Sequence, residues 1–379
     1  MIRVLLIGKY PPLQGGIAAK AWSLSRRMAQ YDIFFDVVGI VPPENYSTPL
    51  PPPASGKTIF VPLCDKNLPW TVPGGDMLTE RIVSAALELA QREKYDLVEV
   101  NYLAPYGLAA ALVAEILGLP LLLRHAGSDI AKLLNYPSTK LAMHQLLHAA
   151  KCIVTHVDNP LFTFFPDIPL SRFQIYPRYQ ADPAIFFPSD KPDDALSRFS
   201  LLCVGKFNYH WKLRGIDLAA HALEKLPNWR LMSIGSGNAF LQARQELEKI
   251  GLGQRLTFSN FIAPHKMGEL LQTVDAVWGF VRPGGVEDVS NIWWEAAASA
   301  RPILSNASLS LPSECQRLRN VVYQIKDEAS SVASALNKIA NTLNKGRAEA
   351  WRTTATNLAQ EYQGYLDTQA SIYRNLVKP

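Results

Sequence analysis

The stretch PGGVEDVSNIWWEAAASARP, Pro283–Pro302, contains a pair of glycines and two carboxylates, Glu287 and Glu295. It follows DAVWGFV, an apolar run typical of a buried strand, and it predicts a turn at Pro283–Gly285 and a helix that begins near Asn291. A buried strand, a glycine turn and a helix in that order are typical of an α/β fold. Glu287 would precede the helix and Glu295 would lie in its second turn, so both carboxylates can point into one cleft.

The same alternation of short apolar runs and helical segments extends over the whole chain. The strand candidates are RVLLIG, FFDVVGIV, TIFVPL, DLVEV, PLLLRH and CIVTH in the first half, and SLLCVG, WRLMSIG, RLTFSN, DAVWGFV and PILSN in the second. Because strands and helices alternate, they predict βαβ units and parallel sheets. After Pro177 the stretch RYQADPAIFFPSDKPDD follows neither periodicity and indicates a domain boundary.

The length of 379 residues also favours two domains, since one domain has about 100–200 residues. We expect two Rossmann-like domains facing a central cleft, the first over residues 1–180 and the second over residues 195–356. The C-terminal helix, 357–379, is expected to cross back to the first domain. Open parallel sheets bind ligands beyond the carboxyl ends of their strands, so the loops that follow the strands are where chemistry is expected.

The composition indicates a globular protein, with 48% hydrophobic and 19% charged residues. The basic residues behind the net charge of +5 are scattered, and no nucleic-acid motif is present, so we expect no nucleic-acid partner. The four cysteines are far apart and indicate reduced cytosolic thiols rather than metal ligands. The longest apolar tract, Leu108–Leu123, falls short of the ~20 residues that span a membrane. A cytoplasmic location follows as an expectation.

Two motifs of the first half stand where strands are predicted to end. Gly15 and Gly16 precede a helix, where paired glycines let backbone amides approach an anion; a simple strand-to-helix turn is the equally weighted alternative. They do not form the G-x-G-x-x-G dinucleotide signature, which argues against a nicotinamide enzyme. His125 follows the run PLLLR, and its position favours a substrate contact over a structural hydrogen bond.

The second half offers a cluster of cations after its first strand. In VGKFNYHWKLRG, one loop is predicted to carry Lys206, Lys212 and Arg214, which could neutralise a diphosphate leaving group. A solvated basic turn is the alternative. The turn IGSGN, with Gly235, is a further strand-to-helix glycine turn.

The paired carboxylates leave more than one role open. Two acids can act as general acid and base, as in glycosidases. Carboxylates also accept hydrogen bonds from sugar hydroxyls, which suits a helix end that holds phosphate. Capping and stabilisation of the helix dipole would explain Glu287 and Asp288 but not Glu295. Trp293 and Trp294 are most simply core residues.

The order of these motifs resembles that of the family-4 glycosyltransferases, retaining enzymes of GT-B fold, along essentially the whole chain. The landmarks that match in sequence order are PPLQGGIA, YDLVEVNYLAPYG with LPLLLRHAGSDI, IYPRYQADPAIFFP, LLCVGKFNYHWKLRG and GGVEDVSNIWWEAAASARPILSN. The resemblance implies a nucleoside-diphosphate sugar as donor, no cofactor and no metal. It also implies that residues 195–356 bind this donor and that residues 1–180 bind the acceptor.

The resemblance also implies roles for individual residues. Glu287 and Glu295 form the family's E-x7-E motif, the first touching the donor sugar and the second the ribose. Lys206, together with Arg214 or Lys212, would bind the diphosphate. Gly15 and Gly16 would approach the diphosphate or the acceptor, and His125 would contact the transferred sugar near the reacting carbon. The positions assigned to the donor loop and its surroundings are Gly235, Asp288, Val289, Ser290 and Asn291.

This sequence departs from the family at the donor loop. The family commonly has E-G-F-G after the first acid, whereas here Asp288, Val289 and Ser290 follow Glu287. Their side chains would narrow or repolarise the loop, which indicates a divergent member. The interdomain passage also has Arg178 and Tyr179 where the family tends to have asparagine and glycine.

We therefore expect a metal-independent retaining glycosyltransferase that moves a hexose-like sugar to a hydroxyl in polysaccharide, glycan or glycolipid assembly. The acceptor would be a glycan, a lipid-linked molecule or a small molecule. Two alternatives stay open: a nucleotide-sugar 2-epimerase of the same fold, and a catalytically silent sugar-nucleotide-binding partner. Lys20, Arg26 and Arg27 on one early helix add the hypothesis of a peripheral contact with an anionic membrane surface.

Overall fold

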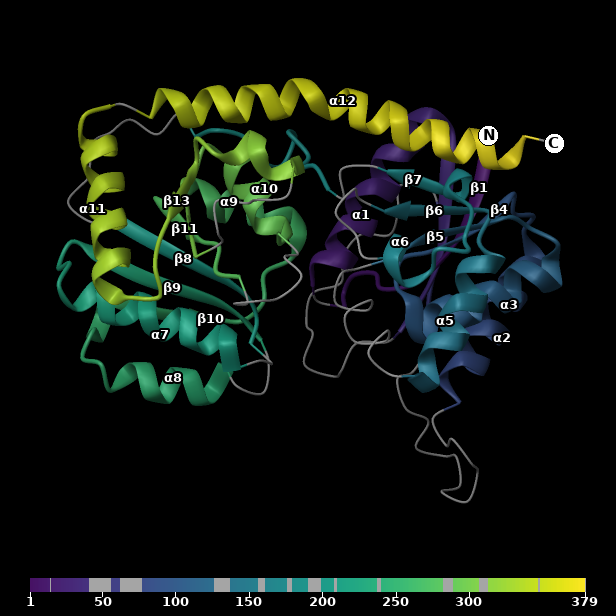
Figure 1. Ribbon diagram of the computed structural model, residues 1–379, viewed down its shortest axis with the longest axis horizontal. Helices are drawn as coiled ribbons and strands as arrows, with labels where there is room; N and C mark the ends of the chain where they lie inside the picture. The colour runs from purple at the N-terminus through teal and green to yellow at the C-terminus, as the bar shows by residue number, and fades with distance from the viewer. Residues whose placement is uncertain are drawn as a thin grey trace, which may run out of the picture. The chain divides into compact units, whose positions relative to one another are not determined.

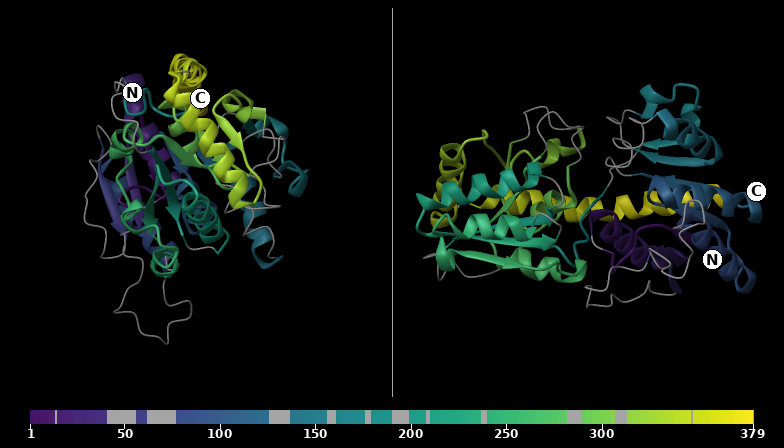
Figure 2. Two further views of the ribbon diagram at one scale, coloured as in Figure 1. Left: turned by 90° about the vertical axis from the view of Figure 1, so that its left-hand side faces the viewer. Right: turned by 90° about the horizontal axis from the view of Figure 1, so that it is seen from below.

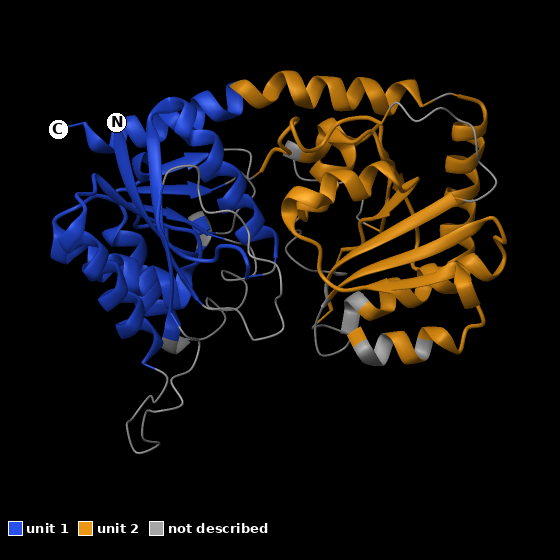
Figure 3. Ribbon diagram, turned by 180° about the vertical axis from the view of Figure 1, so that it is seen from behind, with its two compact units in different colours: residues 1–178, 364–379 blue, residues 179–363 orange. Residues whose placement is uncertain are grey.

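The computed structural model divides the chain into two compact units (Figure 3). Unit 1 comprises residues 1–178 and 364–379, and unit 2 comprises residues 179–363. The residues that the structure describes are 1–13, 15–40, 56–61, 77–125, 137–155, 161–175, 179–189, 199–207, 210–236, 240–281, 289–306, 313–346 and 348–378.

Unit 1 is built on a seven-stranded parallel sheet of order β3-β2-β1-β4-β5-β6-β7. Its strands are β1 (Ile2–Ile7), β2 (Ile33–Ile40), β3 (Thr58–Val61), β4 (Leu97–Val100), β5 (Leu121–Arg124), β6 (Cys152–Thr155) and β7 (Phe173–Ile175). Val4 to Ile7 of β1 are all buried, as expected for a parallel strand covered on both faces. The strand order changes direction between β1 and β4, which is the switch point where sheets of this kind bind ligands.

The helices of unit 1 lie between successive strands along the chain. They are α1 (Gly16–Met28), α2 (Leu78–Arg92), α3 (Leu108–Leu117), α5 (Pro137–Ala149) and α6 (Leu161–Phe164), with short turns η1 (Ala29–Tyr31), the π-helical η2 (Leu103–Gly107) and η3 (Leu170–Arg172). Helix α2 shows how the sequence sets the packing: Ile82, Val83, Ala86 and Leu89 recur at helical spacing and are the residues it buries.

Unit 2 repeats the plan with a six-stranded parallel sheet of order β10-β9-β8-β11-β12-β13. Its strands are β8 (Phe199–Lys206), β9 (Trp229–Ser236), β10 (Leu256–Ser259), β11 (Ala276–Trp278), β12 (Ile303–Ser305) and β13 (Val322–Gln324). Figure 1 shows α7 (His210–Glu224) and α8 (Phe240–Glu248) on one side of this sheet and α9 (Met267–Gln272) and α10 (Asn291–Ala298) on the other. The switch point lies between β8 and β11.

The remaining helices of the chain follow the second sheet. They are α11 (Ala329–Asn344) and α12 (Glu349–Val377), with short 3-10 turns η4 (Gly253–Arg255), η5 (Pro264–Lys266) and η6 (Ser313–Leu318). Helix α12 is one continuous element of 29 residues, drawn in yellow in Figures 1 and 2. Its last part, from Gly364, belongs to unit 1, so the prediction that the C-terminal helix crosses back to the first domain is confirmed.

The predicted α/β architecture is confirmed, and each of the predicted apolar runs contains a strand. The two edge strands β7 and β13 were missed, since FQI and VYQ are three residues long and carry no clear periodicity. The prediction that Lys206, Lys212 and Arg214 share one loop was wrong. Lys206 ends β8, and Lys212 and Arg214 already belong to α7, because this helix starts at His210, earlier than expected.

Gly235 has a packing reason in the structure, because a Cβ at this position would lie 1.9 Å from the carbonyl oxygen of Gly205 and 2.6 Å from the ring of Phe207. We expect Gly235→Ala to lower the free energy of unfolding by about 3 kcal/mol or more, since backbone and a buried ring must move. Gly364→Ala is the matched control: Gly364 lies in α12, and apart from its neighbours in that helix no atom lies within 4 Å of its Cβ position. The control should gain about 0.5–1 kcal/mol in urea denaturation. Equal losses in both variants would contradict the packing argument.

The three cysteines that the structure describes, Cys152, Cys203 and Cys315, are free and buried, as the sequence predicted. Burial raises the pKa of the Cys152 thiol to about 11, so this group stays protonated at neutral pH. Among the described helices, none has both the length and the apolar character that crossing a membrane requires.

Candidate functional site

Glu295 lies in the second turn of α10, where the sequence placed it, and its side chain is buried. The hydroxyl of Tyr179 donates a hydrogen bond of 3.1 Å to Glu295 Oε1. Its neighbours Trp293 and Trp294 are core residues, as predicted, and Trp293 packs where Gly279 leaves room for its indole. Side chains on a helix tilt toward its amino end, so Glu295 points back to the start of α10.

Burial raises the pKa of Glu295 to about 7, and the hydrogen bond from Tyr179 acts in the opposite direction. Among the described side chains, no lysine or arginine forms an ion pair with this carboxyl group. Its Oε2 makes no hydrogen bond to any described residue. A buried carboxyl group with a spare oxygen is a strong acceptor for hydroxyl groups that reach it.

The backbone of Val281 is held by Asn306, which follows β12 directly. Asn306 Oδ1 accepts a hydrogen bond of 2.9 Å from Val281 N, and Asn306 Nδ2 donates one of 3.1 Å to Val281 O. Val281 is the last described residue before the segment 282–288. Asn306 was not predicted from the sequence, although a polar residue directly after a short buried strand is the signal that could have identified it.

Arg214 lies on α7 with its side chain 66% exposed, and its guanidinium is 3.8 Å from Asp327 Oδ2. Asp327 Oδ1 is also 3.4 Å from Asn306 Nδ2. An exposed ion pair of this length contributes less than about 1 kcal/mol, so Arg214 can leave Asp327 for a phosphate at little cost. Asp327 follows β13, and it too belongs to the carboxyl edge of the sheet of unit 2.

The structure describes only some of the other predicted site residues of unit 2. Lys206 ends β8 and Lys212 lies in the first turn of α7, but their side chains lie outside what the structure describes. Glu287 and Asp288 lie outside the described residues altogether. The residues that lead into α10 are Val289, Ser290 and Asn291, with Ser290 in extended conformation at the N-cap. The amino end of a helix carries a partial positive charge, which favours an anion at this end.

The carboxyl edge of unit 1 carries the residues predicted in the first half. Gly15 is the N-cap of α1 with φ 129°, a conformation that requires glycine, and Gly16 is the first residue of the helix. His125 directly follows β5, and its Nε2 lies 2.9 Å from the hydroxyl of Thr155, the last residue of β6. The hydrogen bond to Thr155 fixes the orientation of the imidazole. A structural role of His125 and a contact with the substrate are therefore compatible.

Lys9 and Asn101 occupy the switch point of unit 1 and were not singled out in the sequence. Asn101 Oδ1 accepts from Lys9 N and Asn101 Nδ2 donates to Lys9 O, both at 2.9 Å. The Lys9 ammonium lies 3.3 Å from the ring centroid of Tyr102, a cation–π contact. A Cβ on Gly8 would lie 2.1 Å from Asn101 Oδ1. Glycine at this position therefore leaves room for the two hydrogen bonds between Asn101 and the backbone of Lys9. A lysine two residues after the first buried strand was the available signal.

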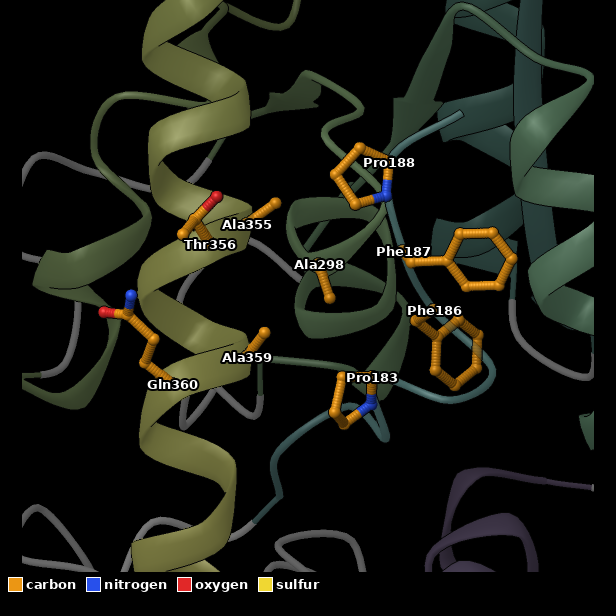
Figure 4. A pocket seen from close by; sticks show the side chains of 9 residues that line it. All are labelled: Pro183, Phe186, Phe187, Pro188, Ala298, Ala355, Thr356, Ala359 and Gln360. Carbon is orange, nitrogen blue, oxygen red and sulfur yellow. The ribbon is translucent and has the colours of Figure 1, made fainter. Parts of the chain in front are cut away.

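Unit 2 also has a pocket of about 390 Å³ whose lining is mainly apolar (Figure 4). Its lining is Pro183, Phe186, Phe187, Pro188, Ala298, Ala355, Thr356, Ala359 and Gln360. Figure 4 shows these side chains coming from the segment 183–188, the end of α10 and α12. This apolar lining carries no charged group that could hold a diphosphate, so we do not assign the donor to it.

No protein-family model matches the sequence, and no curated protein matches it. Solved structures do match. Sucrose-phosphate synthase from Thermosynechococcus elongatus aligns over 99% of both chains with a TM-score of 0.71 at 16% identity. HepE from Anabaena in complex with UDP and glucose aligns over 99% of this chain and 100% of that chain, with a TM-score of 0.68 at 15% identity.

WaaG, a glycosyltransferase involved in lipopolysaccharide biosynthesis, aligns over 98% of this chain and 99% of that chain with a TM-score of 0.63 at 16% identity. Identities this low show the fold alone. The likeness nevertheless covers both units, with their seven-stranded and six-stranded parallel sheets. The chain therefore has the GT-B fold of these glycosyltransferases.

Proposed function

We propose that this protein is a retaining glycosyltransferase that moves a hexose-like sugar from a nucleoside-diphosphate sugar to a hydroxyl group. The fold is that of glycosyltransferases, and the HepE structures hold UDP, glucose and UDP-glucose, so a UDP-sugar is the first donor to test. The acceptor would be a glycan, a lipid-linked molecule or a small molecule, as expected from the sequence resemblance.

The observation that carries the proposal is Glu295. A carboxyl group buried in a helix, with one oxygen held by Tyr179 and one without a described partner, suits the binding of a ribose with its two neighbouring hydroxyls. Burial is costly for a carboxylate and contributes no packing that an apolar residue would not supply. A ligand that uses the charge is the simplest reason for its presence.

In this proposal the remaining residues act on the donor and the leaving group. Lys206 and Arg214, with Lys212 as the alternative to Arg214, neutralise the diphosphate as the bond between the sugar C1 and the phosphate oxygen breaks. The acceptor oxygen forms its bond to C1 on the same face, and its proton passes to a phosphate oxygen of the leaving diphosphate. Because the cations stabilise the departing charge, the proposed transfer requires no metal ion.

The first half supplies positioning groups in the same proposal. Gly15 and Gly16 would bring backbone amides to the diphosphate or the acceptor, and His125 would contact the transferred sugar. Glu287 would bind the donor sugar from the segment before α10. Asp288, Val289, Ser290 and Asn291 would line the donor, and Gly235 would let β9 approach it.

The test is a thermal-shift screen of UDP-, GDP- and ADP-sugars, followed by an assay of nucleotide release with and without glycan acceptors. A sugar donor that binds the native state raises the melting temperature, and transfer then releases nucleotide in step with a glycosylated product. Conversion of the donor to its 2-epimer without acceptor would indicate the epimerase instead. Donor binding with no turnover, not even slow hydrolysis of the donor, would indicate a silent binding partner. No binding at all would contradict the proposal.

A further inference from the structure

Three side chains of unit 1 converge on one point at the end of α5. His144 Nε2 lies 2.6 Å and His148 Nε2 lies 3.0 Å from the same oxygen, Asp167 Oδ2. The two imidazole rings are 4.5 Å apart in an edge-to-face arrangement. One ligand atom from each of the three residues lies within 4.8 Å of the other two, a grouping found once among the described residues.

The helix and its packing fix this geometry. His144 and His148 are four residues apart on α5, so they lie one above the other on one face. Helix α5 is anchored in the core by the buried side chains of Met143, Leu146 and Leu147. Since the helix is held from its buried side, the two imidazoles are presented together and need little reordering to bind a ligand.

Asp167 is held against the histidines by its own neighbours. It follows α6 and precedes η3, in the turn that leads to the edge strand β7. Phe165, two residues earlier, is buried and its ring lies 5.6 Å from that of His144.

The chemistry of the three groups is that of a transition-metal site. Two imidazole nitrogens and one carboxylate oxygen are ligands that zinc accepts at about 2.0–2.2 Å, with water in a fourth position. Tetrahedral ligands at that distance are about 3.4 Å from one another. The imidazole nitrogens must therefore move less than about 1 Å from Asp167 Oδ2 to admit the ion, which side chains 27% to 53% exposed can do.

We propose that His144, His148 and Asp167 bind one zinc ion at the amino-end edge of the sheet of unit 1. Helix α5 runs from the carboxyl end of β5 back to the amino end of β6, and β7 starts just after Asp167. The site is thus at the opposite edge of the sheet from His125. The zinc site goes beyond the proposed function and does not depend on it, because the proposed transfer uses no metal ion and none was expected from the sequence.

Zinc at this site would tie α5 to the chain that enters the edge strand β7. An edge strand is bound by one neighbour only, and β7 pairs with β6 through three residues. Zinc would replace two hydrogen bonds to an exposed carboxylate with three coordinate bonds. The expected consequence is a melting temperature of the full-length protein that rises with zinc and returns with a chelator.

The test is a titration of the chelator-treated full-length protein with zinc by calorimetry, and with Co²⁺ by absorption, since Co²⁺ reports the ligand geometry. We expect one ion per chain and a loss of affinity of at least about 100-fold in His144→Ala and His148→Ala. Loss of a ligand should cost more than loss of an outer-shell partner, which costs about 10–100-fold. Asp167→Asn keeps a hydrogen-bond acceptor, and it takes the place of an alanine variant in this titration if either of them misfolds.

His221→Ala is the matched control. His221 is an exposed histidine on α7 that pairs with two carboxylates, Asp217 and Glu224, but lies outside the cluster. The control should bind zinc as the wild type does and show the same zinc-dependent melting temperature. Absence of stoichiometric binding, or equal binding by wild type, His144→Ala and His148→Ala, would overturn the proposal.

Discussion

Replacement of Glu295 by glutamine is expected to weaken donor binding by roughly 10- to 100-fold, in line with the loss of a hydrogen bond to a charged group. Glutamine keeps the size of the side chain and an oxygen for the Tyr179 hydroxyl, so the change removes mainly the charge. Because the pKa of Glu295 is about 7, wild-type affinity should rise between pH 6 and pH 8 as the carboxylate forms. Calorimetric titration of the best UDP-sugar at both pH values measures this.

The same substitution is expected to have the opposite effect on stability. The pKa of Glu295 rises from 4.5 to about 7 on folding, so the folded state holds the proton more tightly than the unfolded state between these values. The free energy of unfolding of the wild type therefore falls by up to ~3 kcal/mol as the pH rises through this window. Glu295→Gln carries no such penalty and should melt above the wild type at pH 8, but close to it at pH 5.

The effects of Glu295→Gln on donor affinity and on stability together distinguish a binding residue from a structural residue. A variant that loses donor affinity while gaining stability at pH 8 has lost a functional charge, which is the outcome expected of a strained binding site. Glu269→Gln, on the exposed first turn of α9, is the control and should change neither quantity. If Glu295→Gln binds the donor as the wild type does at every pH, the assignment of Glu295 to the donor is wrong.

The sequence predicted the architecture because the information is local. Long apolar runs such as that of β1 and β8 alternate with helical segments, and buried parallel strands have this pattern. The start of α10 and the placement of Glu295 followed from a glycine turn and helical spacing in the same way. What local patterns could not show is which residues of distant segments meet.

The contacts that define the site join segments far apart in the chain. Tyr179 reaches Glu295 across 116 residues, and Asn306 reaches Val281 across 25. Asp167 meets His144 across 23 residues, between a helix and a short turn with no periodicity. A single sequence does not fix these pairs, because many polar side chains of equal chemical suitability stand at the ends of predicted elements. The fold selects among them.

The second large effect is expected at the buried ion pair of Arg124 and Glu99. Both side chains are less than a tenth exposed, and Arg124 Nε donates to Glu99 Oε1 at 2.8 Å. Tyr373 of α12 completes the network: its hydroxyl donates to Glu99 Oε2 at 2.6 Å and accepts from Arg124 at 3.2 Å. Burial acts to lower the pKa of Arg124, but Tyr373 and Glu99 outweigh it and keep the pKa raised.

Arg124→Met is expected to lower the free energy of unfolding by about 3–5 kcal/mol, because it leaves the carboxylate of Glu99 buried without its cation. Combination with Glu99→Gln should recover most of that loss, since the uncompensated charge is then gone. Urea denaturation of the two single variants and the double variant measures the coupling. Arg92→Met is the control: Arg92 pairs with Glu88 on the exposed face of α2, and its loss should cost below about 0.5 kcal/mol.

Tyr373→Phe separates the docking of α12 from the ion pair itself. The ring, which makes an edge-to-face contact with Phe35, is retained, and only the hydroxyl is lost. Glu99 then keeps its cation but loses one donor, so a cost of about 1–3 kcal/mol is expected, smaller than that of Arg124→Met. Since Tyr373 lies on α12, hydrogen exchange should rise in residues 364–377 before the central strands. A cost equal to that of Arg124→Met would mean that the hydroxyl, not the charge pair, holds the network together.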